Sequence, residues 1–484
     1  MHIQNGSINS PQARWLALAI LCMGALMIVL DVSIVNVALP SIREDLGFDI
    51  TTIAWVVNAY TITFGGFMLL GGKLGDLFGE RRLFLIGITL FTVMSLVCGL
   101  ASSQAMLIVG RALQGIGGAI ANAVALALVL NLFQSPGERA KAMGIFGFVA
   151  AGGGSIGVIL GGFLTGALNW HWIFLINLPI GLLTLLLAMR CIPKDTERTR
   201  QMKLDVWGAI TVTSALMLAV YGVIGGNTAG WLSFQTLATL TAGVVVFLVF
   251  LLIESKVAIP LMPLSLFKNR NLSIACTAGI LWSAGMFAWF FLAALYMQTV
   301  AGYSPLAVGL AFLPGNLIMA ALSIGLSAKI VMRFGIRASL ALGLTLVALG
   351  LLYLARVPVE SNFWIDIFPS MVLLGLGAGI SFNPMLLAAM HDVRPEDSGL
   401  ASGVANTAFM MGGALGLAVL ASVAAYRTGS LLAGGSDQFV ALTSGYSIAF
   451  VIGALFAAGA ALLAWFIRIR EKPPQDAALS PHVS

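Results

Sequence analysis

Long apolar segments follow one another along the whole chain, separated by short polar segments. An α-helix needs about 20 apolar residues to cross a hydrocarbon core of about 30 Å. The pattern therefore predicts fourteen membrane-spanning helices. Their approximate ranges are 15–40, 52–72, 82–102, 105–133, 140–166, 170–192, 204–226, 232–254, 271–299, 304–330, 337–356, 363–391, 398–426 and 440–467.

Composition agrees with a chain that resides in a lipid bilayer. Of the 484 residues, 59% are hydrophobic and 9% are charged, against roughly 25% charged residues in soluble domains. The four cysteines and four histidines are scattered, without the spacing of metal ligands. The sequence thus indicates a polytopic membrane protein and predicts no metal, no cofactor and no enzymatic activity, since it also lacks a phosphate-binding loop.

The basic residues orient the predicted helices, because Lys and Arg are retained on the cytoplasmic side of a membrane. With the N-terminus inside, Arg43, Arg356 and Arg427 fall outside and Arg111 falls within a helix. The remaining Lys and Arg residues, of 25 in all, fall on the cytoplasmic side. Both termini are therefore predicted to be cytoplasmic, and the pI of about 9.3 needs no nucleic acid partner to explain it.

Two parts of the chain repeat each other. The segment Gly153–Gly157 is echoed by Gly412–Gly416, and the turn Lys73–Arg82 has a weaker echo in Lys329–Arg337. Internal repeats of this kind are typical of secondary transporters. The predicted fold is an all-α integral membrane protein with two six-helix bundles, 1–198 and 263–484, the second ending in a short cytoplasmic tail. Two additional membrane helices, 199–262, join the bundles.

Glycines in the repeated segments are predicted to serve helix packing, since small residues four apart let two helix backbones approach closely. The glycines assigned to this role are Gly153, Gly157, Gly161, Gly412 and Gly416.

Several segments carry a resemblance to one transporter family. Gly72–Arg82 resembles the loop signature of the major facilitator superfamily, and Leu30–Pro40 resembles the first-helix signature of its fourteen-helix drug:proton antiporter branch. Trp55–Tyr60, Trp170–Gly181 and Pro260–Arg270 are similar to further stretches of that branch. The resemblance implies that the loop is a cytoplasmic gate. Its residues in that role are Gly72, Asp76, Gly79, Arg81 and Arg82.

This sequence departs from the family pattern at two places. The loop has Leu77 and Glu80 where basic residues are usual. The antiporter signature of the fifth helix contains Gly-Pro, whereas this chain has Gly157-Val158. The missing proline keeps import or symport open as an alternative to antiport.

Asp31 and Arg111 are the ionisable residues that lie deepest in the predicted helices. At about 1.5 Å per residue they lie roughly 13 Å and roughly 9 Å below the outer surface, hence in the same half of the membrane. A charge at such depth costs at least ~2.5 kcal/mol, which favours a functional role. An approaching or receding cation favours the charged or the protonated carboxyl, so the pair is predicted to couple transport to protons. The resemblance of Arg111–Gly118 to the family's proton-transfer signature agrees; a purely structural ion pair is the alternative.

Other polar and aromatic residues are predicted to line a substrate cavity. Trp282, Met286, Trp289 and Tyr296 share one side of a helix, and aromatic faces suit flat lipophilic or cationic ligands. Packing or lipid contact is the alternative for this stripe, as interhelical hydrogen bonding is for the amides. The remaining cavity candidates are Asn36, Asn58, Tyr60, Gln114, Asn316, Asn383 and Asn406.

These observations favour a proton-coupled efflux transporter of a bacterial cell membrane, exporting lipophilic drugs, cationic ones among them, or natural products by alternating access. Its partners would be a small-molecule substrate, protons and the lipid bilayer; an accessory envelope protein is left open. The alternatives are a proton-coupled symporter or importer of a small metabolite and a membrane receptor or scaffold without transport. The short loops disfavour the last, since none is long enough to hold a signalling domain.

Overall fold

The computed structural model describes residues 11–49, 51–133, 135–193, 195, 205–257, 260–322, 326–391, 393 and 398–468. Within these ranges the regular structure is helical and contains no strand. The predicted domain boundary at 198/199 and the predicted C-terminal tail beyond 468 lie outside the described residues.

The first half of the chain forms seven α-helices and one 3₁₀ turn. They are α1 (Pro11–Leu46), η1 (Thr52–Ala54), α2 (Trp55–Phe78), α3 (Glu80–Gly99), α4 (Gln104–Leu132), α5 (Pro136–Ala167), α6 (Trp172–Leu175) and α7 (Asn177–Cys191).

Two helices follow, α8 (Val206–Ala229) and α9 (Phe234–Lys256), which we call the linker hairpin. The rest of the chain forms a second group. Its elements are η2 (Leu264–Lys268), α10 (Arg270–Thr299), α11 (Pro305–Ala321), α12 (Ser327–Leu354), the π-helical turn η4 (Phe363–Ile367), α13 (Phe368–Met390), α14 (Ser398–Ala433) and α15 (Gln438–Ala464).

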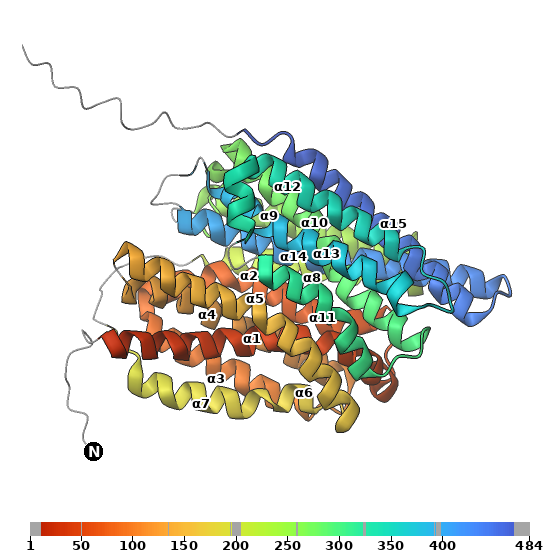
Figure 1. Ribbon diagram of the computed structural model, residues 1–484, viewed down its shortest axis with the longest axis horizontal. Coiled ribbons are helices and arrows are strands. Elements are labelled where there is room, and N and C mark those ends of the chain that lie inside the picture. The colour runs from red at the N-terminus through yellow and green to blue at the C-terminus, as the bar shows by residue number, and fades with distance from the viewer. Residues whose placement is uncertain are drawn as a thin grey trace, which may run out of the picture.

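The helices lie roughly along one direction, with α1–α7 on one side of the molecule and α10–α15 on the other (Figure 1). We call these two groups the N bundle and the C bundle. The end of the molecule where α1 begins is called the inner end, and the end where α1 finishes is called the outer end. The helices α10 and α11 of the C bundle contact α1 of the N bundle, and the linker hairpin contacts both bundles through α2 and α14.

Each predicted apolar range corresponds to a helix or a pair of consecutive helices. Eleven helices in the described residues are long and apolar enough to cross a membrane. The apolar stretches Ile156–Ala167 and Pro305–Ala321 are shorter. The range 170–192 contains a break, because α6 and α7 are separate helices. The all-helical membrane fold is therefore confirmed, while the number of fourteen spans stays a prediction.

Local sequence explains where many helices begin. Ser103, Ser304 and Asp437 precede α4, α11 and α15, and each side chain accepts hydrogen bonds from backbone N–H groups of the first turn. These groups have no partner within the helix, so a side-chain acceptor stabilises the helix start.

The repeated loops share a backbone feature. Gly79, between α2 and α3, has a φ angle of 95°, and Gly335, within α12, has a φ angle of 79°. Glycine adopts positive φ without the steric cost that a side chain adds. Both turns thus need glycine at the same position of the repeat, and Gly335 divides α12 where the sequence predicts a turn.

The glycines predicted to serve packing lie where helices cross. A Cβ on Gly157 would meet the Leu30 carbonyl oxygen at 3.0 Å, and one on Gly161 would meet the Ile34 carbonyl oxygen at 2.7 Å. The same holds for α14 against α10, since a Cβ on Gly412 would lie 2.6 Å from the Cα of Ile280. Likewise, Gly153 faces side chains of α1, and Gly416 faces Ala284 of α10. The pairs α1–α5 and α10–α14 are therefore equivalent close contacts in the two bundles.

Hydrophobic packing differs between the two ends. One cluster contains buried residues from both bundles, among them Ile34–Ile42 of α1 and Met286–Met297 of α10. Towards the inner end the N bundle has its own cluster, which includes Leu18–Ile28. The C bundle has another, which includes Leu272–Ala278. We call these the outer cluster, the inner N cluster and the inner C cluster.

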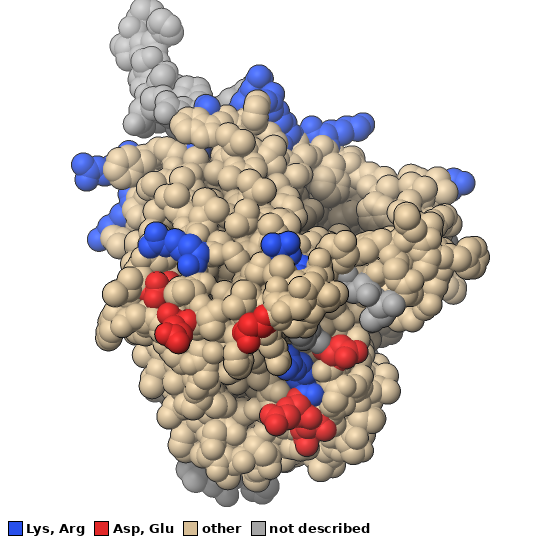
Figure 2. All heavy atoms as spheres, turned by 90° about the vertical axis from the view of Figure 1, so that its right-hand side faces the viewer, with Lys and Arg blue, Asp and Glu red and all other residues tan. Residues whose placement is uncertain are grey.

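Most of the visible surface carries no charged side chain (Figure 2). Figure 2 looks onto the outer end, where acidic side chains lie near basic ones and further basic side chains stand at the upper and left edges of the view, within a surface that is otherwise uncharged. The linker helix α9 has a mean hydropathy of 2.6 over its most apolar window, yet only 17% of that window is buried in the protein. An apolar helix with so little protein contact is suited to lipid surroundings.

Candidate functional site

Asp31 lies in the middle of α1 and forms an ion pair with Arg111 of α4. Asp31 is 0% exposed and Arg111 is 1% exposed. Arg111 Nη1 lies 2.5 Å from Asp31 Oδ2. The structure thus brings together the two deep charges that the sequence places in the same half of the membrane.

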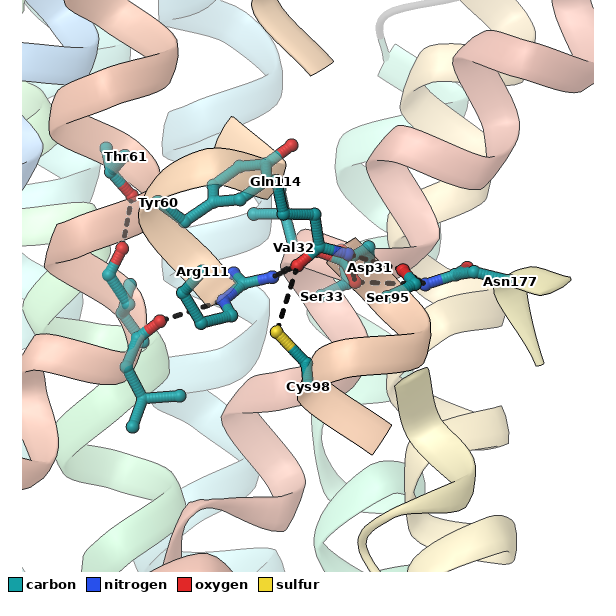
Figure 3. A network of polar contacts seen from close by, with 12 residues as sticks. Asp31, Val32, Ser33, Tyr60, Thr61, Ser95, Cys98, Arg111, Gln114 and Asn177 are labelled. Atoms are coloured by element: carbon teal, nitrogen blue, oxygen red, sulfur yellow. Dashed lines mark hydrogen bonds and ion pairs between the residues drawn. The ribbon is translucent and has the colours of Figure 1, made fainter. Parts of the chain in front are cut away.

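Two amides hold the other oxygen of the Asp31 carboxylate (Figure 3). Gln114 Nε2 and Asn177 Nδ2 donate to Asp31 Oδ1 at 2.9 and 3.0 Å. Both amides also donate to Ser95 Oγ, at 2.6 and 3.1 Å. Four helices, α1, α3, α4 and α7, therefore contribute side chains to one buried network.

Arg111 has further partners that fix its position. Its Nε donates to the Val56 carbonyl oxygen at 2.9 Å, and its Nη1 also donates to Gln114 Oε1 at 2.7 Å. The guanidinium carbon lies 4.2 Å from the centre of the Tyr60 ring. A cation over an aromatic face is stabilised by the ring quadrupole, so α2 also takes part in holding Arg111.

Arg111 and the two amides offset the cost of burying the Asp31 carboxylate. A buried carboxylate is costly unless paired and hydrogen-bonded. Here Arg111, Gln114 and Asn177 supply three donors.

The sequence interpretation missed Ser95 and Asn177 as members of this network. Asn177 lies within the family-like segment Trp170–Gly181, but nothing in its spacing indicates which way it points. Asn177 is the first residue of α7. Ser95 gives no signal beyond a hydroxyl in an apolar helix. Gln114, predicted to line the cavity, instead belongs to the Asp31 network.

The predicted aromatic stripe on α10 divides into two parts. Trp289 and Tyr296 are buried in the outer cluster, and the Tyr296 hydroxyl donates to the Pro358 carbonyl oxygen at 2.6 Å. Met286 is buried in the same cluster. These contacts favour packing, the alternative reading, for the outer part. Trp282 is only half-buried and lies 5.8 Å from Phe382 between ring centres.

In the described residues, the amides predicted to line a cavity do not contact one another as one group. Asn36 and Asn406 each donate to a carbonyl oxygen of their own helix, at 3.1 and 3.0 Å. Asn58 and Asn316 are buried, and Asn58 Oδ1 and Nδ2 and Asn316 Nδ2 have no hydrogen-bond partner. Asn383 is half-buried. Buried amides without a partner need water or a ligand, so Asn58 and Asn316 stay the stronger candidates.

The predicted gating loop is held by a residue outside its motif. Asp195 Oδ1 and Oδ2 accept from the backbone N–H groups of Arg81 and Arg82, at 3.0 and 3.1 Å. Arg81 also donates through Nη2 to the Met189 carbonyl oxygen at 2.5 Å. Gly72 lies in α2, and Gly79 forms the turn. The predicted role of Asp76 rests on a side chain outside the described part of the structure. Among described residues, no group of three or more His, Cys, Asp or Glu side chains could hold a metal.

Comparison with known proteins identifies the family of this chain. The profile of the Major Facilitator Superfamily matches residues 21–417. The chain is 35% identical over 472 residues to the puromycin resistance protein pur8 of Streptomyces alboniger, covering 96% of this chain and 93% of that protein. It is 36% identical over 483 residues to the cephamycin export protein CmcT of Amycolatopsis lactamdurans, covering 99% and 98%.

A solved structure gives the same result for the fold. The nucleoside transporter NupG superposes with a TM-score of 0.63 at 12% sequence identity, covering 93% of this chain and 99% of that one. At this identity the likeness concerns the fold alone. Together with the profile and the relatives, it leads to the conclusion that the chain belongs to the Major Facilitator Superfamily of membrane transporters.

Proposed function

We propose that this multi-pass membrane transporter is a proton-coupled efflux pump of the fourteen-helix drug:proton antiporter branch. The observation that carries the proposal is the buried ion pair of Asp31 and Arg111 with its amide donors. In the proposed cycle, 1–198 and 263–484 move as two bodies around a central site, with both termini in the cytoplasm. Asp31 takes up a proton in one state and releases it in the other.

The difference between the two ends of the molecule supports alternating access. The outer cluster joins the bundles, whereas the inner N cluster and inner C cluster take their buried residues from one bundle each. Such a structure has its outer end closed. Opening outward would separate the outer cluster, and the helices that hold Arg111 and Asp31 would shift with it.

The direction and substrate class of transport rest on the relatives. Two of the proteins similar to this chain are a puromycin resistance protein and a cephamycin export protein. A third is the tetracenomycin C resistance and export protein of Streptomyces glaucescens, 33% identical over 419 residues. We infer an exported substrate of the same general kind, a lipophilic drug or natural product.

Import or symport is the second candidate, because Val158 takes the place of the antiporter proline. Val158 is buried, and its carbonyl oxygen lies 2.8 Å from the position of a Cβ on Gly309 of α11. The fifth helix therefore makes a close contact between the bundles without a proline. Efflux remains the leading proposal because the similar proteins include resistance and export proteins.

The loop Gly72–Arg82 is proposed to act as a latch at the inner end when the transporter opens outward. The N–H groups of Arg81 and Arg82 already donate to Asp195, which follows α7 in the chain. We expect Asp76→Asn to slow transport while substrate binding is kept, and Asp437→Asn at the exposed start of α15 to leave the rate unchanged.

Flux in proteoliposomes tests the proposal. Purified protein is reconstituted with a pH gradient of either sign, and a panel of lipophilic cations, neutral antibiotics and small metabolites is followed. Antiport predicts substrate movement against the proton gradient and loss of accumulation when the gradient is dissipated. Movement of substrate together with protons would establish symport, and no gradient-dependent flux for any compound would contradict both.

A further inference from the structure

The inner ends of α2 and the linker hairpin meet at three charged side chains, and the transport proposal gives no role to the two acidic ones. Asp205 precedes α8, Glu254 lies near the end of α9, and Lys73 lies in α2. Asp205 and Glu254 are each only 3% exposed. The apolar residues Leu70, Ala209 and Leu261 form a small cluster across the same elements, so the charges are enclosed by protein.

Each carboxyl group uses one oxygen to accept from the backbone. Asp205 Oδ1 accepts from the Gly208 N–H at 2.8 Å. Glu254 Oε2 accepts from the Met262 N–H at 3.1 Å, after the chain has left α9. These bonds fix the orientation of both carboxyl groups and leave one oxygen of each for another partner.

The two remaining oxygens face the same point. Asp205 Oδ2 and Glu254 Oε1 are buried and have no hydrogen-bond partner. They lie 2.6 and 2.9 Å from the position that a Cβ would take on Gly208. The pair is therefore close together over a residue without a side chain, and any larger residue at 208 would collide with both oxygens.

An ionised carboxylate can only accept hydrogen bonds, so two ionised groups cannot satisfy each other. Two like charges in a buried site also repel, and such pairs retain a proton between them. One proton would supply the missing donor for both oxygens.

Charge balance agrees with a single proton. Lys73 donates through Nζ to the Pro260 carbonyl oxygen and interacts electrostatically with both carboxyl groups. Among the described residues of α2, Lys73 is the charged side chain that interacts with Asp205 and Glu254. One ammonium, one carboxylate and one carboxylic acid have no net charge, which lowers the cost of burying the group.

We propose that Asp205 and Glu254 bind one proton between Asp205 Oδ2 and Glu254 Oε1, and that this proton holds the linker hairpin against the inner end of α2. When the proton leaves, the two carboxylates repel across Gly208 and the contact between α8 and α9 weakens at that end. The site is separate from Asp31, which lies in the N bundle between the outer and inner N clusters.

Isosteric amides test the proposal, because each replaces the proton by an N–H donor. In Glu254→Gln, the side-chain oxygen can still accept from Met262 and the NH₂ group can donate to Asp205 Oδ2. In Asp205→Asn, the side-chain oxygen can still accept from Gly208 and the NH₂ group can donate to Glu254 Oε1. Both variants should fold, and either alone suffices for the test.

The measurement is equilibrium unfolding in detergent by titration with SDS, from about pH 5 to about pH 9. The two carboxyl groups lose their protons near pH 4 in the unfolded chain, whereas the folded protein keeps the shared proton to a higher pH. Over that pH range the folded state binds one proton more than the unfolded state. The wild-type unfolding constant should therefore rise by up to about tenfold per pH unit and then level off. Both amide variants should lack this rise.

Two controls separate this site from others. Asp437→Asn changes an exposed carboxylate that also precedes a helix, and should keep the wild-type pH dependence. Asp31→Asn should keep it as well, whether or not Asp31 couples transport. Equal pH dependence in the wild type, Glu254→Gln and Asp205→Asn would overturn the proposal, and so would loss of the pH dependence in Asp437→Asn.

Discussion

At the outer end, buried residues of both bundles form one hydrophobic cluster, whereas at the inner end each bundle keeps a cluster of its own. Specific contacts reinforce the outer cluster. Gln298 Nε2 of α10 donates to the Val37 carbonyl oxygen of α1 at 2.8 Å. A Cβ on Gly162 of α5 would lie 2.6 Å from the Pro305 carbonyl oxygen. Opening the outer end thus requires breaking apolar, hydrogen-bond and close-backbone contacts together.

The Asp31 network lies where these two kinds of packing meet. Along α1, Ile28 belongs to the inner N cluster and Ile34 to the outer cluster, with Asp31 between them. On α4, Arg111 follows Leu107 of the outer cluster by one turn. The ion pair therefore lies at the boundary between the outer cluster and the inner N cluster.

The largest effect is expected for Asp31→Asn. The amide keeps the shape of the side chain and can still accept from Gln114 and Asn177, but it cannot exchange a proton. Uphill substrate accumulation in vesicles under a pH gradient should fall to the level at which inside and outside concentrations are equal. Asp366→Asn, at the outer start of the C-bundle helix α13, is the control and should accumulate substrate normally. Wild-type accumulation by Asp31→Asn would show that another group carries the proton.

Removal of the partner should cost stability. Arg111→Ala leaves Asp31 buried without its cation, and breaking a buried pair in this way costs about 3–5 kcal/mol. The free energy of unfolding in detergent should fall by that amount. Adding Asp31→Asn should restore part of it, because the neutral amide needs no cation. Arg111→Lys should lose less, since it keeps the charge without the planar fork. Equal losses in the single and double variants would contradict the ion-pair interpretation.

A methyl group at the contact between the bundles should distinguish the two ends. In Gly162→Ala the new Cβ meets backbone atoms of Pro305 and Leu306, which cannot rotate away. In Gly65→Ala, closer to the inner end, it lies 3.0 Å from Met410 Cβ, so a shift of a few tenths of an ångström is enough to accommodate it. Overpacking costs about 1–3 kcal/mol, so Gly162→Ala should favour the state with the outer end open. Labelling of a cysteine introduced at the outer end should increase in Gly162→Ala and stay near wild type in Gly65→Ala. Greater labelling in Gly65→Ala than in Gly162→Ala would mean that the contact at Gly65 is tighter than the contact at Gly162.

The smallest effect is expected for Gln298→Ala. It removes one hydrogen bond between the bundles, which contributes about 1 kcal/mol. The population with the outer end open should rise about fivefold, measured by the same labelling. Gln235→Ala, on the exposed start of α9, is a matched control without a contact between the bundles. No difference between the two variants would show that the outer cluster alone keeps that end closed.

Much of this architecture follows from the sequence. Hydrophobic length locates the helices, and the depth of Asp31 and Arg111 places them at the same level before any contact is known. The glycine spacing in Gly153–Gly161 likewise indicates a close helix contact, although not its partner. These features depend on position along one helix, which the sequence gives directly.

What the sequence does not give depends on helix rotation. Asn177, the first residue of α7, enters the network because the face of α7 that carries it meets Asp31. Trp289 is buried in the outer cluster, although an aromatic residue at its position would suit a cavity or lipid equally well. The carboxyl pair of Asp205 and Glu254 joins residues separated by a whole helical hairpin. Such contacts depend on which faces meet, and that is decided by packing of all helices together.

The sparse protein contact of α9 gives the bilayer a direct influence on this molecule. At about 1.5 Å per residue its 23 residues span roughly 34 Å, slightly more than a hydrocarbon core of about 30 Å. A helix that is too long for its bilayer tilts, and the tilt follows the thickness of the membrane. Glu254 lies near the inner end of α9, so it moves when the helix tilts. Longer or shorter acyl chains thereby change the geometry of a buried charged group without binding to it.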